Sequence, residues 1–124
     1  MKNRINKFIV VCVLLTLTSC KTEKKLDEIY NEAGYAIGKI ISSLSGTFAI
    51  QYNYSYFVGS SEYKDNKKEG GLNPSGTYMM GKRFLVVYKL SEPKKSDINF
   101  KYSIETEQDF LDMLVLFQNN PPKH

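Results

Sequence analysis

Histidine, cysteine and tryptophan are scarce in this chain, which has one, two and none of them among its 124 residues. The single histidine, His124, is the last residue, and terminal residues are usually poorly ordered. The sequence therefore offers no Cys–His pair, Ser–His–Asp set or zinc-ligand spacing, and the usual nucleophilic triads and zinc sites are not expected. The stretch 73–82 lacks the spacing of a phosphate-binding loop. We expect no metal and no cofactor.

A hydrophobic run long enough to cross a membrane is also missing from the start of the chain. Residues 8–17 are apolar except for Thr16. Ten helical residues reach about 15 Å, whereas a bilayer core is roughly 30 Å thick. Lys2, Arg4 and Lys7 precede this stretch, and small polar residues follow it. This order is typical of a secretory signal peptide, which we place at 1–19.

The end of this segment, Leu17-Thr18-Ser19-Cys20, resembles a bacterial lipobox. The resemblance implies that the Cys20 sulfur receives a diacylglyceryl group, that a peptidase cuts between Ser19 and Cys20, and that the new amino group is acylated, as with palmitate. Two acyl chains hold a protein stably on a membrane where one does not. The alternative is an ordinary signal peptide with an incidental cysteine.

Processing would change the charge and the cysteine content of the chain. Residues 1–19 contain three of the 17 basic residues and none of the 13 acidic ones, which leaves 14 against 13 in the mature chain. The high isoelectric point is then no sign of nucleic-acid binding, because no basic stripe remains. Cys12 would leave with the signal and Cys20 would be modified. The mature domain would hold neither a thiol nor a disulfide, so its core must stabilise it.

The mature chain is expected to form one small α+β domain, with an antiparallel sheet of three to five strands and one C-terminal helix. The mostly charged stretch 21–33 is interpreted as a solvated tether. The alternative is a helix from about Glu23 to Asn31, because Leu26, Ile29 and Tyr30 fall near one of its faces. The predicted organisation is a signal peptide at 1–19, a lipidated N-terminus and tether at 20–34, a β-rich domain with a helix at 35–120, and a tail at 121–124.

Strands are predicted from period-2 alternation and from short apolar runs. The clearest alternation puts six side chains on one face of residues 47–58: Phe48, Ile50, Tyr52, Tyr54, Tyr56 and Val58. Residues 84–88 are almost continuously apolar, which predicts a strand inside the sheet, and Pro93 is expected to end this region. The predicted strands are 35–43, 47–58, 62–68, a region within 77–90, and a short strand at 100–104, with a loop at 69–76.

The period changes to that of a helix after residue 105. Thr106 is a suitable N-cap, with Asp109 three residues later as in a capping box. Four apolar residues recur at helical spacing and are expected to pack on the sheet: Phe110, Met113, Leu114 and Phe117. Pro121 and Pro122 are expected to stop the helix.

Two further patterns resemble known bacterial proteins. The segments YSYFVG at 54–59, EYK at 62–64 and GKRFLVVY at 81–88, with Pro93, resemble a widespread family of small β-rich extracytoplasmic domains of unknown function, many of them lipoproteins. The resemblance covers about residues 35–100, but the asparagines that precede the turn glycine and the proline in that family are missing here. The charged start after Cys20 is similar to that of surface lipoproteins of the Bacteroidota, which favours the outer membrane or cell surface over the inner membrane.

Three groups of residues are candidates for a site. The stripe Tyr52, Tyr54 and Tyr56 could be a binding face for a glycan or a protein; the favoured alternative is a core face covered by the C-terminal helix. The acidic group at 105–112 could hold calcium or act as paired carboxylates, but it lacks the glycine turn of a calcium loop, so a helix start is favoured. Asp97 and Glu105 are the carboxylates with apolar neighbours that a hydrolase would need.

The sequence as a whole predicts a lipid-anchored protein of the bacterial cell envelope whose domain is a non-enzymatic interaction module. Its expected partners are the membrane, through the anchor, and another envelope protein or a glycan. Two alternatives stay open, an envelope hydrolase or transglycosylase and an immunity-type protein that binds a toxin.

Overall fold

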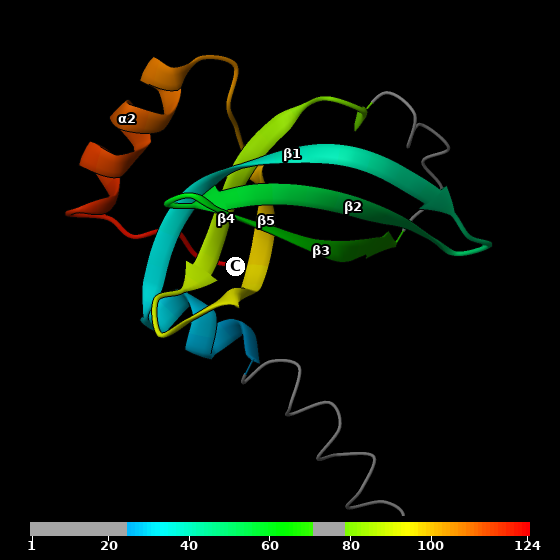
Figure 1. Ribbon diagram of the computed structural model, residues 1–124, viewed down its shortest axis with the longest axis horizontal. Coiled ribbons are helices and arrows are strands. Elements are labelled where there is room, and N and C mark those ends of the chain that lie inside the picture. Colours follow the sequence, from blue (N-terminus) through cyan, green and yellow to red (C-terminus); the bar gives the residue numbers. More distant parts are fainter. Residues whose placement is uncertain (1–24, 71–78) are drawn as a thin grey trace, which may run out of the picture.

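The computed structural model describes residues 25–70 and 79–124 of the chain (Figure 1). The predicted signal peptide, the segment Leu17–Cys20 and most of the loop expected at 69–76 lie outside these residues. Within the described part, residues 25–31 are helical and are followed by five strands and one helix. These are β1 (Ala33–Ser45), β2 (Ala49–Val58), β3 (Ser61–Gly70), β4 (Arg83–Lys89), β5 (Glu92–Ser103) and α2 (Glu107–Phe117).

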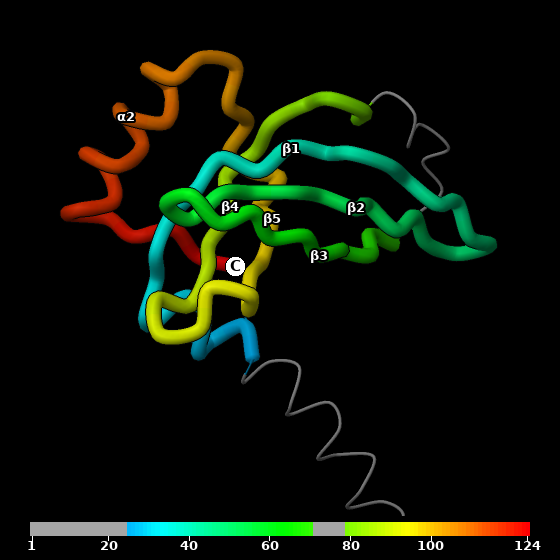
Figure 2. The backbone as a smooth tube through the Cα atoms, viewed as in Figure 1, coloured from blue at the N-terminus to red at the C-terminus, as the bar shows by residue number. Residues whose placement is uncertain are grey.

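The five strands form one antiparallel sheet in the order β3-β2-β1-β4-β5. The α+β class and the C-terminal helix are therefore confirmed. The sheet curls strongly, so that its two edge strands, β3 and β5, come back toward each other and their residues are in contact (Figure 2). The curl gives the sheet a concave inner face and a convex outer face, each with its own core.

Aromatic and branched side chains fill the inner core without help from a helix. Its buried members come from all strands except β3: Ala36, Ile40, Ile50, Tyr52, Tyr54, Tyr56, Phe84, Val86 and Ile98. The helical residues 25–31 and α2 lie on the outer face, where a second cluster is buried: Ile29, Leu85, Val87, Ile104 and Phe117. Successive residues of β4 thus enter opposite cores, because side chains alternate across a strand. This explains why the 84–88 run is apolar throughout.

Close packing of β1 against β4 depends on two glycines. A Cβ atom at Gly34 would lie 2.4 Å from the ring of Tyr88, and one at Gly38 would lie 2.3 Å from a methyl group of Val86. Contacts this short do not occur between real atoms. The glycine inside the predicted strand 35–43 therefore lets neighbouring side chains cover the backbone of β1.

The alternation predicted for 47–58 is confirmed within β2, whose residues alternate between buried and half-buried from Ala49 to Tyr56. Phe48 is the exception, because it is 84% exposed. It precedes the first residue of β2 and belongs to the turn after β1, so it does not share the inner face. The return strand is also confirmed, as β3.

The prediction for the region around Pro93 was wrong. Pro93 does not end a strand region but is the second residue of β5, a strand of 12 residues of which only the last part was expected. β5 is an edge strand, where a missing backbone N–H is tolerated. β4 starts later than the region predicted from residue 77, at Arg83, and it lies between β1 and β5 as expected for a strand inside the sheet.

The folded part begins earlier than the expected boundary at residue 35. Residues 25–31 are helical, which was the less favoured interpretation of this charged stretch. Ile29 is completely buried in the outer core, and Leu26 and Tyr30 are half-buried. Three apolar residues on one face are thus enough to bind this short helix to the sheet, so residues 25–34 of the predicted tether belong to the folded part.

The capping box at the start of α2 is confirmed. The Thr106 hydroxyl accepts a hydrogen bond from the N–H of Asp109 at 3.2 Å, and the Asp109 carboxylate accepts one from the N–H of Thr106 at 3.0 Å. α2 ends at Phe117, which is its only buried residue. Phe110 and Met113 are half-buried in the outer core as expected, so α2 covers the sheet with one narrow face.

Candidate functional site

Polar side chains connect the two edge strands where the curled sheet comes back on itself. The Tyr56 hydroxyl donates to the carbonyl oxygen of Pro93 at 2.6 Å, and the Lys67 ammonium donates to that of Ile98 at 2.8 Å. We call this region, where side chains of β2 and β3 reach β5, the polar seam. Here side chains take the place of the backbone ladder that joins strands elsewhere in the sheet.

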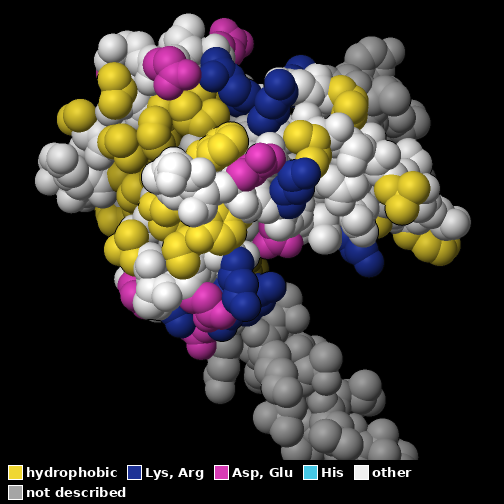
Figure 3. Space-filling view, viewed as in Figure 1, with side chains coloured by type: hydrophobic (Ala, Val, Ile, Leu, Met, Phe, Trp, Pro, Cys, Tyr) yellow, Lys and Arg dark blue, Asp and Glu magenta, His cyan; other side chains and the backbone are white. Residues whose placement is uncertain are grey.

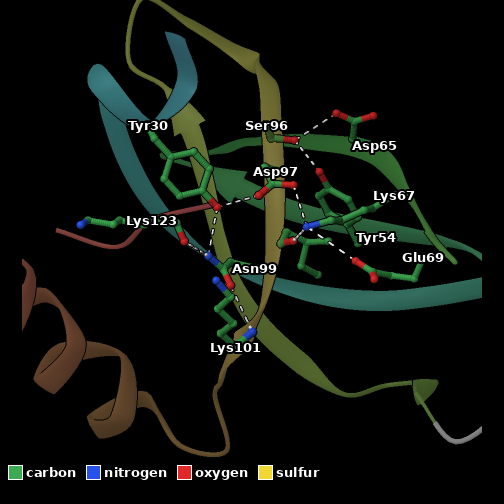
Figure 4. A network of polar contacts seen from close by, with 11 residues as sticks. Tyr30, Tyr54, Asp65, Lys67, Glu69, Ser96, Asp97, Asn99, Lys101 and Lys123 are labelled. Atoms are coloured by element: carbon green, nitrogen blue, oxygen red, sulfur yellow. Dashed lines mark hydrogen bonds and ion pairs between the residues drawn. The ribbon is translucent and has the colours of Figure 1, made fainter. Parts of the chain in front are cut away.

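Asp97 of β5 is the centre of the polar seam (Figure 4). Its side chain is 6% exposed, and both of its oxygens are occupied: Oδ1 lies 3.0 Å from the Lys67 ammonium, and Oδ2 accepts a 2.6 Å hydrogen bond from the Tyr30 hydroxyl. Burial, and then the hydrogen bond to Asp97, raise the pKa of Tyr30 far above its usual value. Tyr30 therefore stays a neutral donor, and Asp97 is a buried charge with two partners.

A second branch of the polar seam runs through Ser96. The Tyr54 hydroxyl lies 2.7 Å from Ser96 Oγ, which donates to Asp65 at 3.1 Å. Since the single hydroxyl proton of Ser96 goes to Asp65, Tyr54 donates to Ser96. Burial raises the pKa of Tyr54 and keeps it in its neutral form. Every buried polar side-chain atom in the described part of the chain has a hydrogen-bond partner.

Asn99 ties the last residues of the chain to this network. Its amide nitrogen donates to the Tyr30 hydroxyl and to the carbonyl oxygen of Lys123, both at 3.1 Å. His124 lies 2.8 Å from the Asp27 carboxylate, and its ring is 5.3 Å from that of Tyr30. The expectation that His124 is disordered was therefore wrong, because the tail is held on β5 and on the helical residues 25–31.

A cavity of about 320 Å³ opens beside the polar seam, and six of its seven lining residues have polar or charged side chains. Lys67 points into this region, but its ammonium already has Asp97, the Ile98 carbonyl and, at 3.9 Å, Glu69 as acceptors. The ammonium of Lys67 is thus engaged within the protein. A general acid or base needs a carboxylate that can reach a substrate proton, and both oxygens of Asp97 are engaged within the protein. The arrangement joins strands and offers no free group for chemistry at this carboxylate.

The structure does not bring the two predicted hydrolase carboxylates together. Asp97 lies within β5, whereas Glu105 is exposed beyond the end of that strand. Asp97 pairs with Val87 of β4, whereas Ile104, the residue before Glu105, donates its N–H to the Arg83 carbonyl. The two acids thus lie about four residues of β4 apart, or roughly 13 Å at about 3.3 Å per residue. Carboxyl pairs of glycosidases lie about 5–10 Å apart, so Asp97 and Glu105 cannot act as such a pair.

The tyrosine stripe is covered. Tyr52, Tyr54 and Tyr56 are 8%, 0% and 1% exposed, so they are core residues and present no open binding face. The covering layer was predicted wrongly, since α2 lies on the other face of the sheet. Side chains of β4 and β5 cover the stripe instead, because the sheet curls over its own inner face. Sequence periodicity shows which residues share a face, but not what covers it.

The acidic group at 105–112 starts a helix, as favoured. The N–H groups of Thr106 and Glu105 donate to the Asp109 carboxylate, and they lower its pKa. Glu107 lies 3.5 Å from the Arg83 guanidinium, which also contacts the Glu105 carbonyl. In the part of the chain that the structure describes, no three potential metal ligands come together.

Two exposed apolar surfaces were missed by the sequence reasoning. Leu111, Val115 and Leu116 of α2 are each more than half exposed, although the opposite face of this helix is packed on the sheet. Leu44 and Phe48, at the end of the β1–β2 hairpin, are 66% and 84% exposed. The α2 residues could have been found as apolar positions outside the predicted stripe 110, 113, 114 and 117. Nothing local distinguished Phe48 from the alternating residues that follow it.

Comparison of the chain with protein-family models, with curated proteins and with solved structures gives no match. None of the helices among residues 25–70 and 79–124 has the length and hydrophobicity needed to span a membrane.

Proposed function

We propose that the chain is a lipid-anchored protein of the bacterial cell envelope, at the outer membrane or cell surface, whose domain binds a partner without catalysis. The observation that carries the proposal is the segment Leu17–Cys20, which places a cysteine directly after a basic start and a short apolar run. This order suits export followed by lipid attachment.

The start of the folded part agrees with such an anchor. The helical residues begin by residue 25, and Ile29 is already fully buried. Five residues of chain span at most about 18 Å, so a lipid on Cys20 would hold the domain close to the bilayer surface. A domain held there can act as a binding module without a transmembrane segment of its own.

The described surface favours binding over catalysis. The buried carboxylate of Asp97 is used to join strands, and the other candidate, Glu105, is exposed beyond the end of β5. In contrast, α2 turns three large apolar side chains toward solvent. Figure 3 shows hydrophobic side chains gathered over α2 and the neighbouring part of the sheet. Apolar surface left exposed on one side of a packed helix is typical of a protein-binding surface.

Replacing Cys20 by serine tests the anchor. The wild-type chain, expressed in a bacterium that processes lipoproteins, should incorporate labelled palmitate and sediment with membranes. Cys20→Ser should lose both the label and the membrane retention, because serine offers no thiol to the lipid transferase. Cys12→Ser, in the apolar segment that processing removes, is the matched control and should behave as wild type. A soluble, unlabelled wild-type protein would falsify the proposal.

A further inference from the structure

The outer face of β2, of β3 and of β1 from Lys39 onward is exposed and carries basic and uncharged polar side chains, together with the ring of Phe57. Pairing of the strands places Lys39, Ser55 and Lys64 side by side, and also Gln51 with Lys68 and Asn53 with Asn66. All of these residues are exposed or half-buried. One acidic residue, Glu62, also lies on this face, where it pairs with Phe57. We call this surface, with its three lysines, the basic face.

The lysines of the basic face form no ion pair within the described part of the chain. Lys39, Lys64 and Lys68 have no carboxylate within 4.0 Å there, which is also true of Lys25, Lys82, Lys101 and Lys123. Their neighbours on the face are amides and hydroxyls, which can hydrogen-bond to phosphate oxygens. The basic face therefore presents positive charge together with hydrogen-bond donors.

An apolar tip continues the basic face at the end of the β1–β2 hairpin. Leu44 pairs with Gln51, which in turn pairs with Lys68, and the exposed Phe48 lies in the turn that follows β1. Leu44, Phe48 and Lys68 line one shallow hollow of about 340 Å³. Figure 3 shows hydrophobic side chains at this end of the molecule.

We infer that the basic face and its apolar tip bind the surface of an anionic phospholipid membrane. Lysines attract acidic head groups over a short range, and exposed leucine and phenylalanine enter the boundary between head groups and acyl chains. The inference rests on the proposed anchor, which would keep the domain within reach of such a surface. α2 carries Glu107, Asp109 and Asp112 and no basic residue, so the same lipids would repel it. It lies at the opposite end of the molecule from the hairpin tip (Figure 1).

The test uses the full lipidated chain in vesicles, with a fluorescent label on Thr47→Cys at the hairpin tip and a matched label on Gln108→Cys of α2. With phosphatidylglycerol present, brominated acyl chains should quench the label at residue 47 and leave that at residue 108 unchanged. Quenching at residue 47 should fall about tenfold in pure phosphatidylcholine, and likewise in the variant Lys39→Glu, Lys64→Glu, Lys68→Glu. The chain that carries neither Thr47→Cys nor Gln108→Cys should take no label, because its Cys20 is modified.

Sedimentation with neutral vesicles tests the lipid anchor alone, whereas quenching at residue 47 tests the docking of the basic face. A chain that sediments but shows no quenching at residue 47 in anionic vesicles overturns the inference and leaves the proposed function intact. Equal quenching in neutral and anionic vesicles also overturns it, because charge then does not select the surface. A chain that fails to sediment with neutral vesicles contradicts the anchor. The same chain is then added to anionic vesicles: quenching at residue 47 supports the inference, and no quenching there overturns it.

Discussion

Replacing Tyr54 by aspartate is expected to unfold the domain. Tyr54 is 0% exposed in the inner core, and its ring packs against that of Tyr56 at 5.9 Å. Losing a buried aromatic ring costs about 3–5 kcal/mol, and the new carboxylate would be buried near Asp65 and Asp97, whose charges already help to raise the pKa of Tyr54. The sum approaches the 5–15 kcal/mol that stabilises a typical domain. Circular dichroism should show no cooperative thermal transition.

Asn53→Asp is the matched control, one residue away on the outer face. Asn53 is half-buried, accepts a hydrogen bond from Gln51 at 3.1 Å and donates one to Ser42 at 2.8 Å. An aspartate can accept from both partners, so the free energy of unfolding should change by about 1 kcal/mol or less. If both variants melt like the wild type, the assignment of the two faces of β2 is wrong.

The second large effect is expected from Asp97→Ala. This change removes the partner of the Lys67 ammonium and of the buried Tyr30 hydroxyl in one step. Breaking a buried ion pair from one side costs about 3–5 kcal/mol, but Lys67 keeps 29% exposure and a distant contact with Glu69. We therefore expect a loss of about 2–4 kcal/mol, or roughly 10–20 °C in Tm.

Two controls separate the ion pair from a general loss of packing. Glu69→Ala removes an exposed carboxylate at 3.9 Å from the same ammonium, so it should cost less than about 0.5 kcal/mol. Adding Lys67→Met to Asp97→Ala should recover part of the stability, because no unpaired charge is left. If Asp97→Ala and Glu69→Ala destabilise equally, the polar seam is not held by Asp97.

Local features of the sequence were the ones that could be predicted. The period of β2 and the capping box of α2 each depend on a few neighbouring residues, and both are confirmed. β5 was mostly missed because Ser96, Asp97 and Asn99 look like a loop in sequence. They are buried in the structure because their hydrogen-bond partners come from elsewhere, Tyr30 being 67 residues from Asp97 and 69 from Asn99.

The polar seam as a whole could not be predicted, because its members are also distant from one another in the sequence. Its residues come from the helical stretch at 25–31, from β2, β3 and β5 and from the tail, and no spacing links them. The curl of the sheet brings them together, and it arises from packing between strands rather than from any one segment. Sequence reasoning singled out Asp97 only as a candidate carboxylate for the alternative hydrolase, and it did not foresee a contact that closes the sheet.

The intact mass of the protein extracted from membranes tests the central claim, the lipid anchor, most directly. We predict a chain that begins at Cys20 and carries a diacylglyceryl group on its sulfur, with the N-terminal peptide holding all of the added mass. A chain of unmodified mass, whether it begins at Met1 or at any later residue, would contradict the anchor.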